Sequence, residues 1–110
     1  MPEELCPVKE TIKIIGKKWY LIIIFELTKK PKGFNELKES VKGISSKVLS
    51  ESLKKLTEKE IVQRKIYSES PIRVEYSLTE KGLDLKAIFD DMRKWGVEWS
   101  ICDEIDQIIS

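Results

Sequence analysis

Six side chains that lie close together in the sequence are the best candidates for a chemical function. They are three serines and three lysines: Ser45, Ser46, Lys47, Ser50, Lys54 and Lys55. Hydroxyl and ammonium groups donate hydrogen bonds, and the ammonium groups also attract anions. Such side chains can reach the base edges and phosphates of a DNA major groove, provided that one helix presents them on an exposed face.

The segment that carries these side chains has the periodicity of an amphipathic helix. Leu49, Leu53 and Leu56 follow one another at i, i+4 and i+7 and form an apolar stripe, and the lysines lie off that stripe. Ser45 and Ser46 stand where the helix should begin, and serine is a favoured N-cap residue. The pattern predicts a helix with one polar, exposed face.

The position of each polar residue along this helix predicts its role. Base contacts concentrate at the N-terminus of a recognition helix, where free N–H groups and the helix dipole also favour phosphate. We therefore expect Ser46, Lys47 and Ser50 to contact base edges or nearby phosphates. Lys54 and Lys55 lie further along and are expected to contact phosphates.

A shorter helix is expected just before this one. It follows a loop at residues 29–33, Asn35 can cap it, and Leu37 and Val41 face inward. The two helices, joined by residues 41–44, have the order of a helix-turn-helix.

Two strands are expected after the second helix. Residues 61–67 and 73–78 alternate apolar and polar side chains, and residues 68–71 form the tip between them. A helix-turn-helix followed by such a hairpin is a winged helix-turn-helix.

Arg73, at the base of the wing, is the best candidate in the hairpin for a DNA contact. It could reach the backbone or the minor groove of flanking DNA, and Arg64 and Lys65 are weaker candidates. An equally weighted alternative is an ion pair between Arg73 and Glu75 or Glu69.

Two helices are expected before the helix-turn-helix. Pro7 suits a first helical position, and Val8, Ile12 and Ile15 form a short apolar stripe. Residues 17–28 are apolar on nearly every side, which is typical of the central helix of a small bundle.

A long helix is expected after the hairpin, with Thr79 as its N-cap and Glu80 complementing the helix dipole. Its apolar residues recur at spacings of three and four, as in the seam of a helix pair. They are Leu85, Ile88, Met92, Trp95, Trp99 and Cys102. Two tryptophans form a large apolar area, so the seam indicates a homodimer, with packing inside one chain as the alternative.

These elements predict one domain of mainly α class with a small β-hairpin wing, spanning residues 1–110. The N-terminal helices occupy residues 6–28, the helix-turn-helix 34–59, the wing 61–78 and the C-terminal dimerisation helix 79–110. A chain of this length can fold without disulfides or metal.

The distribution of charge agrees with a nucleic-acid contact in the middle of the chain. Residues 17–76 carry 14 basic and 8 acidic groups, whereas residues 1–16 and 77–110 have net charges of −1 and −4. The basic part contains the helix-turn-helix and the wing, so the acidic ends are expected to point away from DNA.

The composition argues against metal sites, catalysis and membrane insertion. The chain has no histidine and its two cysteines lie near opposite ends, so the usual zinc sites are absent. We expect no cofactor and no enzymatic activity, since there is neither a glycine-rich phosphate loop nor a nucleophile elbow. The longest apolar run, residues 19–25, is too short to span a bilayer, and without a signal peptide the chain is expected to be cytoplasmic.

Several segments together resemble the HxlR-type winged helix-turn-helix regulators. In order, over residues 6 to about 96, they are Cys6 to Val8, Ile15 to Trp19, Phe34 to Leu37, Gly43 to Leu49, and Pro71 to Thr79 with Gly82. The resemblance implies a homodimeric, sequence-specific transcriptional regulator in which the terminal helices build the dimer. Two recognition helices entering major grooves roughly 34–36 Å apart would read an inverted repeat in double-stranded DNA.

Two residues depart from the pattern of this family. Glu60 stands where the family usually has glycine after the recognition helix, so the helix must end at a cost of about 1 kcal/mol or through a different turn. Gly33 stands where the family usually has a basic residue, which removes one expected phosphate contact.

The two cysteines raise an alternative in which the regulator senses oxidants or electrophiles. Some HxlR-type regulators use a cysteine in a Cys-Pro-Val setting, and the resemblance carries this role over to Cys6. The positive end of a helix dipole would favour its thiolate form. Cys102 is expected to pack in the seam, and a disulfide from Cys6 of one chain to Cys102 of the other would need Cα atoms within about 7 Å. A winged helix that binds only protein is a further alternative, which the retained lysines disfavour.

Overall fold

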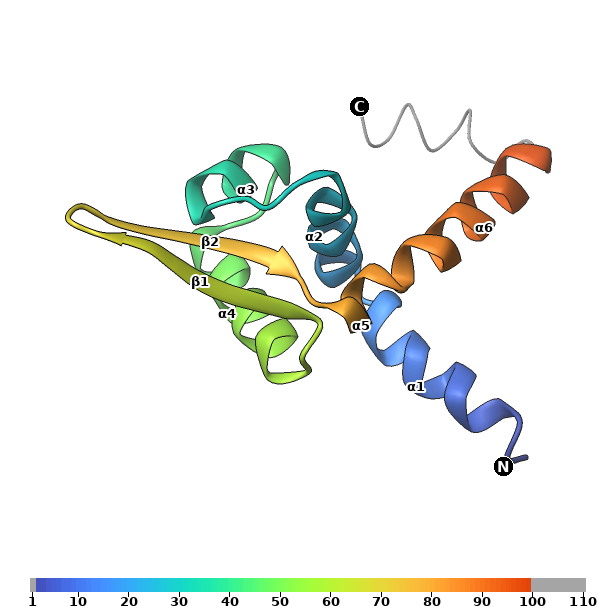
Figure 1. The fold of residues 1–110 in the computed structure, drawn as a ribbon. Helices are drawn as coiled ribbons and strands as arrows, with labels where there is room; N and C mark the ends of the chain where they lie inside the picture. The colour runs from blue at the N-terminus through green and yellow to red at the C-terminus, as the bar shows by residue number, and fades with distance from the viewer. Residues whose placement is uncertain (1, 100–110) are drawn as a thin grey trace.

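The computed structural model describes residues 2–99, apart from the side chain of Glu69. Its elements follow one another as α1 (Leu5–Ile15), α2 (Lys18–Lys29), α3 (Phe34–Ser40), α4 (Ser46–Glu58), β1 (Val62–Glu69), β2 (Ile72–Leu78), α5 (Glu80–Leu83) and α6 (Leu85–Glu98). Figure 1 shows α2, α3 and α4 gathered beside one long hairpin, while α1 and α6 extend away from them. The predicted mainly α class with a β-hairpin wing is confirmed, and the architecture is a winged helix-turn-helix.

The start of α3 differs from the expectation. Gly33, and not Asn35, is the N-cap residue, and the backbone N–H of Gly33 donates to the carboxylate of Glu36 at 3.4 Å. Asn35 was the wrong choice because the chain already enters the helix at Phe34. A Cβ atom at Gly33 would lie 3.3 Å from the carbonyl oxygen of Val74, so the small residue also lets the hairpin approach this turn.

The recognition helix α4 begins as predicted. Ser45 is its N-cap, and the Ser45 hydroxyl accepts a hydrogen bond from the backbone N–H of Val48 at 3.1 Å. Leu49, Leu53 and Leu56 are buried on one side of the helix. The expected apolar stripe is therefore the side that packs on the core, and the opposite side is left for contacts with other molecules.

The end of α4 resolves the question raised by Glu60. Its φ is 61°, the only positive φ at a non-glycine residue between residues 2 and 99. The Ile61 N–H donates to the Leu56 carbonyl and the Glu60 N–H to the Thr57 carbonyl, both at 3.0 Å. This is the Schellman pattern, which normally places glycine at the left-handed position. The chain therefore forms a turn in which glycine is usual, with glutamate in the strained left-handed conformation.

The wing is longer than predicted. The strands pair antiparallel from Val62 opposite Leu78 to Glu69 opposite Ile72, with a register shift between Ile66 and Ser68. The tip is therefore shorter than residues 68–71, because pairing continues beyond the irregularity to Glu69.

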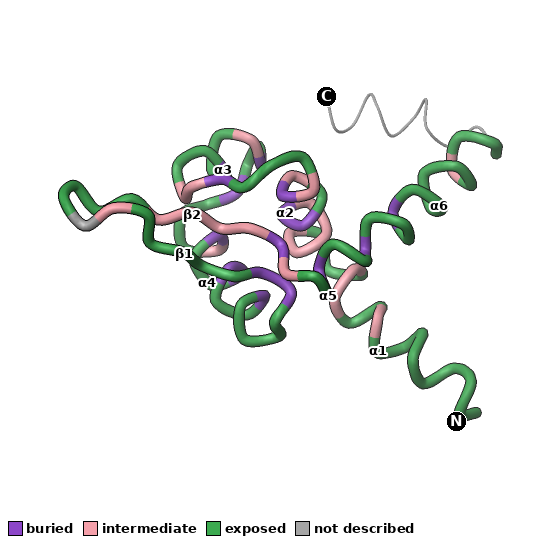
Figure 2. Tube along the Cα trace, viewed as in Figure 1, coloured by how far each residue is buried: buried purple, intermediate pink, exposed green. Residues whose placement is uncertain are grey.

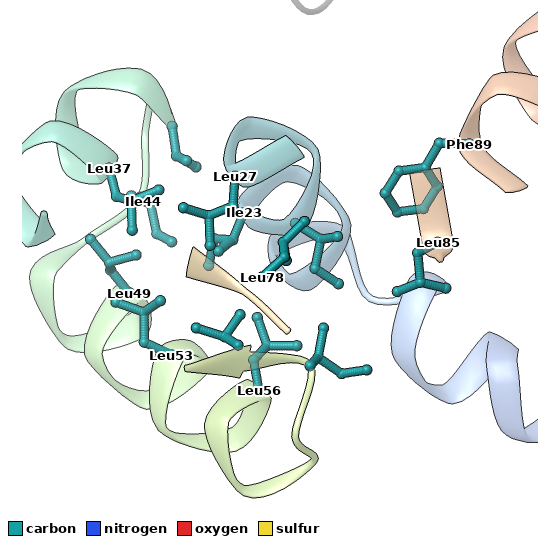
Figure 3. Close-up of a cluster of buried hydrophobic side chains, with 14 residues drawn as sticks. Ile23, Leu27, Leu37, Ile44, Leu49, Leu53, Leu56, Leu78, Leu85 and Phe89 are labelled. Atoms are coloured by element: carbon teal, nitrogen blue, oxygen red, sulfur yellow. The ribbon is translucent and has the colours of Figure 1, made fainter. Parts of the chain in front are cut away.

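The core lies where α2, α3, α4 and the inner end of the hairpin meet. Ile23 and Ile24 of α2 are fully buried, which agrees with the expected central position of this helix. Figure 3 shows leucine and isoleucine side chains from these elements converging on one another. Each fully buried side chain of this size contributes roughly 1.5–3 kcal/mol to stability, so this small cluster fixes the orientation of α4.

The C-terminal helix is interrupted, contrary to expectation. The hydroxyl of Thr79 caps α5 by accepting from the N–H of Gly82 at 3.1 Å, as predicted, but the regular helix breaks at Asp84 before α6 begins. Leu85 and Phe89, four residues apart on one face of α6, are buried beside one another (Figure 3). Phe89 did not belong to the predicted seam.

The helices at the two ends have few buried residues. No residue of α1 is buried, and α1 starts at Leu5, two residues before the position assigned to Pro7. The burial drawn in Figure 2 shows α1 and the outer part of α6 as mainly exposed. Apolar residues in the outer parts of both helices, such as Val8 and Ile12 of α1 and Met92 and Trp95 of α6, are therefore exposed.

Candidate nucleic-acid interface

The exposed side of α4 carries the predicted DNA-contacting residues. Ser46, Lys47, Ser50, Lys54 and Lys55 are all exposed. Hydroxyl groups thus stand near the N-terminus of the helix and ammonium groups along its length. Free N–H groups and the positive end of the dipole at the N-terminus also favour phosphate there.

Two members of the predicted set are already engaged within the chain. The Ser45 hydroxyl caps α4, which leaves it less free for a base contact. The ammonium group of Lys55 lies 3.6 Å from the carboxylate of Glu58. An exposed pair of this kind is worth roughly 0–1 kcal/mol, so Lys55 can exchange it for a phosphate.

A shallow groove of about 370 Å³ lies between α4 and the hairpin. Ser50 and Lys54 line one side of it, and Arg64 and Tyr76 line the other. Arg64, predicted to be a weaker candidate than Arg73, is thus brought beside the recognition helix, because the register pairs it with Tyr76 in the middle of the hairpin.

Arg73 lies elsewhere than predicted. It pairs with Ser68 near the outer end of the hairpin, and not at the base of the wing, because it follows Pro71 in the tip by only two residues. Arg73 is exposed, and among the described side chains it has no ion pair with Glu75. Of the two ion-pair partners considered for Arg73, Glu75 therefore does not form the pair.

Lys32 has a role that sequence reasoning missed. Its backbone N–H donates to the carbonyl of Tyr76 at 3.0 Å, and the N–H of Tyr76 donates to the carbonyl of Lys32 at 2.8 Å. Its ammonium group is buried and donates to Glu26 at 2.8 Å and to Ser40 at 3.2 Å. Lys32 thus joins the hairpin to α2 and α3. Because Lys32 lies in a loop rich in lysine, nothing in the sequence predicted that its side chain would be buried.

The carboxyl group of Glu26 is the centre of this cluster. Its burial acts to raise its pKa, but the hydrogen bonds and charges of Lys32 and Lys29 outweigh burial and hold the pKa below its usual value. Glu26 is therefore charged at neutral pH, and its ion pairs are formed under the conditions in which the chain would bind DNA.

The residues predicted for a dimer interface divide into two groups. Contrary to its assignment to an intermolecular seam, Leu85 packs in the core of its own chain, because it shares with Phe89 the face of α6 that is buried there. The remaining four are exposed: Ile88, Met92, Trp95 and Trp99. Cys6 is an exposed free thiol on α1, and Cys102 lies outside the described residues.

Two negative findings hold for residues 2–99. No cluster of three or more histidine, cysteine or carboxylate side chains is suited to a metal ion. No helix in this range is long and apolar enough to cross a membrane.

The chain has close counterparts among known proteins. Residues 14–104 match the family model described as HxlR-like helix-turn-helix. The chain is 39% identical over 110 residues to the HTH-type transcriptional regulator YodB of Bacillus subtilis, covering 94% of this chain and 98% of YodB.

Two solved structures resemble the fold closely. That of reduced YodB from B. subtilis gives a TM-score of 0.77 at 40% identity and covers 87% of this chain and 91% of that one. The redox regulator HypR in its oxidized form gives a TM-score of 0.76 at 38% identity and covers 84% and 96% of the respective chains.

The fold and the exposed basic helix define a winged helix-turn-helix of the DNA-binding class. The matches specify it further: the chain belongs to the HxlR family of helix-turn-helix transcriptional regulators.

Proposed function

We propose that this regulator binds an inverted repeat in double-stranded DNA as a homodimer, with α4 of each copy in a major groove. The observation that carries the proposal is the exposed row of Ser46, Lys47, Ser50 and Lys54, with Arg64 facing it across the groove. Hydroxyl and cationic groups read base edges and neutralise phosphates. The function rests on binding, and no catalytic step is required.

The homodimer is supported by the apolar faces at both ends of the chain. Leu5, Val8 and Ile12 are exposed on α1, and Trp95 and Trp99 on α6. Exposed apolar residues gathered in this way are typical of protein interfaces, where tryptophan is a common anchor. Trp95→Ala or Trp99→Ala should therefore raise the dimer dissociation constant, measured by sedimentation, by at least tenfold, a shift of about 1.4 kcal/mol.

The DNA contact is tested by separating specific from non-specific binding. Duplexes selected from a random pool provide the specific ligand, and unselected duplexes provide the non-specific ligand. Lys47→Ala, near the start of α4, should weaken specific binding more than non-specific binding. Lys54→Ala should weaken both alike and lower the slope of log affinity against log salt by about one.

The matched control for both variants is Lys86→Ala, which removes an exposed lysine from α6. It should leave both affinities unchanged. Equal losses for the two α4 variants on both kinds of DNA would contradict the division of roles. Binding that is absent, or insensitive to salt, would contradict the DNA proposal itself and favour a module that binds protein.

A second proposal concerns regulation by oxidants or electrophiles through Cys6. Its thiol is exposed near the start of α1, and two of the similar solved structures are of a regulator in its reduced form and a redox regulator in its oxidized form. The chain should be treated with diamide, run on a non-reducing gel and titrated with DNA, beside the Cys6→Ser variant. If neither protein cross-links nor changes affinity, sensing through Cys6 is wrong.

A further inference from the structure

The outer half of the wing exposes apolar side chains that its own fold does not use. Ile72 is 71% exposed, Tyr67 57% and Ile66 53%. The hairpin extends away from the core (Figure 1), and these three residues do not belong to the buried hydrophobic cluster of the described part of the chain. Exposed apolar groups gathered in this way mark an interaction surface.

Strand alternation places most of this surface on the side of the hairpin that faces the recognition helix. Arg64, which lines the groove with Ser50, is two residues before Ile66, and successive side chains of a strand alternate between its faces. Ile66 pairs with Val74, and Ile72 lies two residues further out on the same face as Val74. The apolar surface thus continues the proposed DNA surface outward from α4.

The spacing suits the minor groove next to the major groove that α4 would occupy. Ile72 lies four residues beyond Tyr76, which at about 3.3 Å per residue is roughly 13 Å along β2. The major and minor grooves alternate at roughly half of the 34–36 Å helical repeat. An element that starts beside Ser50 and extends outward over this distance is long enough to reach the neighbouring minor groove.

We propose that Ile66 and Ile72 form an apolar wedge that enters the minor groove and partly unstacks a base step, so that the DNA bends. This inference rests on the proposed DNA binding and adds a means of sequence selection to it. Arg64 on one side and Arg73 on the other supply the positive charge that holds the wing against the phosphates. Apolar side chains used in this way kink DNA by roughly 20–90°.

The wedge gives the regulator a preference at positions that no side chain reads by hydrogen bonding. Pyrimidine–purine steps such as TA unstack easily, whereas runs of adenine are stiff. Operators should therefore carry a flexible step where the wing meets the DNA, outside the bases that α4 contacts.

A competing explanation for Ile66 and Ile72 is the high β-propensity of isoleucine, since strands favour β-branched residues wherever they lie. Threonine is also β-branched but has a polar hydroxyl. Ile66→Thr together with Ile72→Thr therefore keeps the strand preference and removes the apolar wedge. Ile72→Thr alone provides a second variant at the most exposed position. Leu83→Gln removes a similarly exposed side chain from α5, at the other end of the hairpin, and is the matched control.

The experiment uses the full chain and duplexes selected from a random pool, with fluorophores at the two DNA ends to measure bending and 2-aminopurine at the flanking step to measure unstacking. Wild type should bend the DNA and raise the 2-aminopurine emission. The double threonine variant should lose both signals and bind about tenfold more weakly, because a buried isoleucine contributes that much or more to affinity. The slope of log affinity against log salt should be unchanged in the double threonine variant, and Leu83→Gln should behave as wild type.

Three results would overturn the wedge. Unchanged bending and affinity in the double variant would leave β-propensity as the explanation. A change in its sedimentation instead of its DNA bending would show that a second copy covers the patch. If the double variant loses its circular dichroism spectrum, Ile72→Thr decides in the same assays. Wild type that binds a selected duplex without bending it would overturn the wedge alone. If selection from the random pool yields no duplex that wild type binds, the proposed function is overturned as well.

Discussion

The ammonium nitrogen of Lys32 lies 2.8 Å from a carboxylate oxygen of Glu26, and the two side chains are only 8% and 14% exposed. Lys29 reaches the same carboxylate from outside, at 3.1 Å. Because the backbone of Lys32 pairs with Tyr76 of β2, this ion pair connects α2 to the wing. The contribution of this ion pair to the free energy of unfolding can be measured by mutation.

Lys32→Met should lower the free energy of unfolding by about 1–3 kcal/mol, since it leaves a largely buried carboxylate with one partner fewer. Urea denaturation measures the loss. Lys30→Met breaks the exposed pair with Glu36 and should cost less than about 1 kcal/mol. Adding Glu26→Gln to Lys32→Met should restore part of the loss; strictly additive effects would show that the two side chains do not interact.

The lowered pKa of Glu26 predicts a pH dependence of stability. Burial acts to raise this pKa, but the hydrogen bonds and charges of Lys32 and Lys29 lower it by more than burial raises it. The carboxyl group of the folded chain therefore titrates below its ordinary value of 4.5. Its contribution is therefore fully present above pH 4.5 and is lost as the pH falls through the folded-state pKa. Urea titrations of wild type and Glu26→Gln between pH 7 and 3 should converge at the acid end. A difference that grows on acidification would refute the assigned sign.

Glu60→Gly should stabilise the chain by about 1 kcal/mol, because glycine adopts the left-handed conformation without the steric cost of a Cβ atom. For a domain of this size the melting temperature should rise by roughly 4–8 °C. Glu60→Ala is the control, since alanine has the same strain as glutamate at this φ. If both variants melt together, the strain at residue 60 is negligible.

Gly82→Ala should destabilise the chain by about 1–3 kcal/mol or more through overpacking. A Cβ atom at residue 82 would collide with the carbonyl group of Ile61 and lie 3.1 Å from the side chain of Leu78. Lys81→Ala, one residue earlier, removes only an exposed hydrogen bond to the Lys59 carbonyl and should cost about 0.5–1.5 kcal/mol at most. Equal stability of Gly82→Ala and wild type would mean that α5 can move away from the α4–β1 turn.

Periodicity and capping were sufficient to predict the elements of the helix-turn-helix. The stripe of Leu49, Leu53 and Leu56 and the cap at Ser45 are local features, so the sequence around them contains the information. The exposure of Lys47 and Ser50 follows from the same pattern. This is why the fold class and the exposed face of α4 could be anticipated.

Features that depend on distant contacts could not be predicted in the same way. Lys32 is buried only because Glu26 and Ser40 meet it in the folded chain. Leu85 fits the same heptad spacing as Ile88 and Met92, which are exposed, and only the packing of the folded chain distinguishes it from them. The pairing of Arg73 with Ser68 depends on a register shift that single-strand alternation does not reveal.

The hairpin is a two-stranded sheet, so within residues 2–99 the outer edge of β1 has no neighbouring strand. An open edge can template a strand from another molecule and lead to aggregation. Here the edge carries Arg64 and Lys65 and is distorted next to Ile66, and charge and irregularity both oppose the addition of a further strand. The same features therefore oppose edge-to-edge pairing of the wings of two copies of this chain.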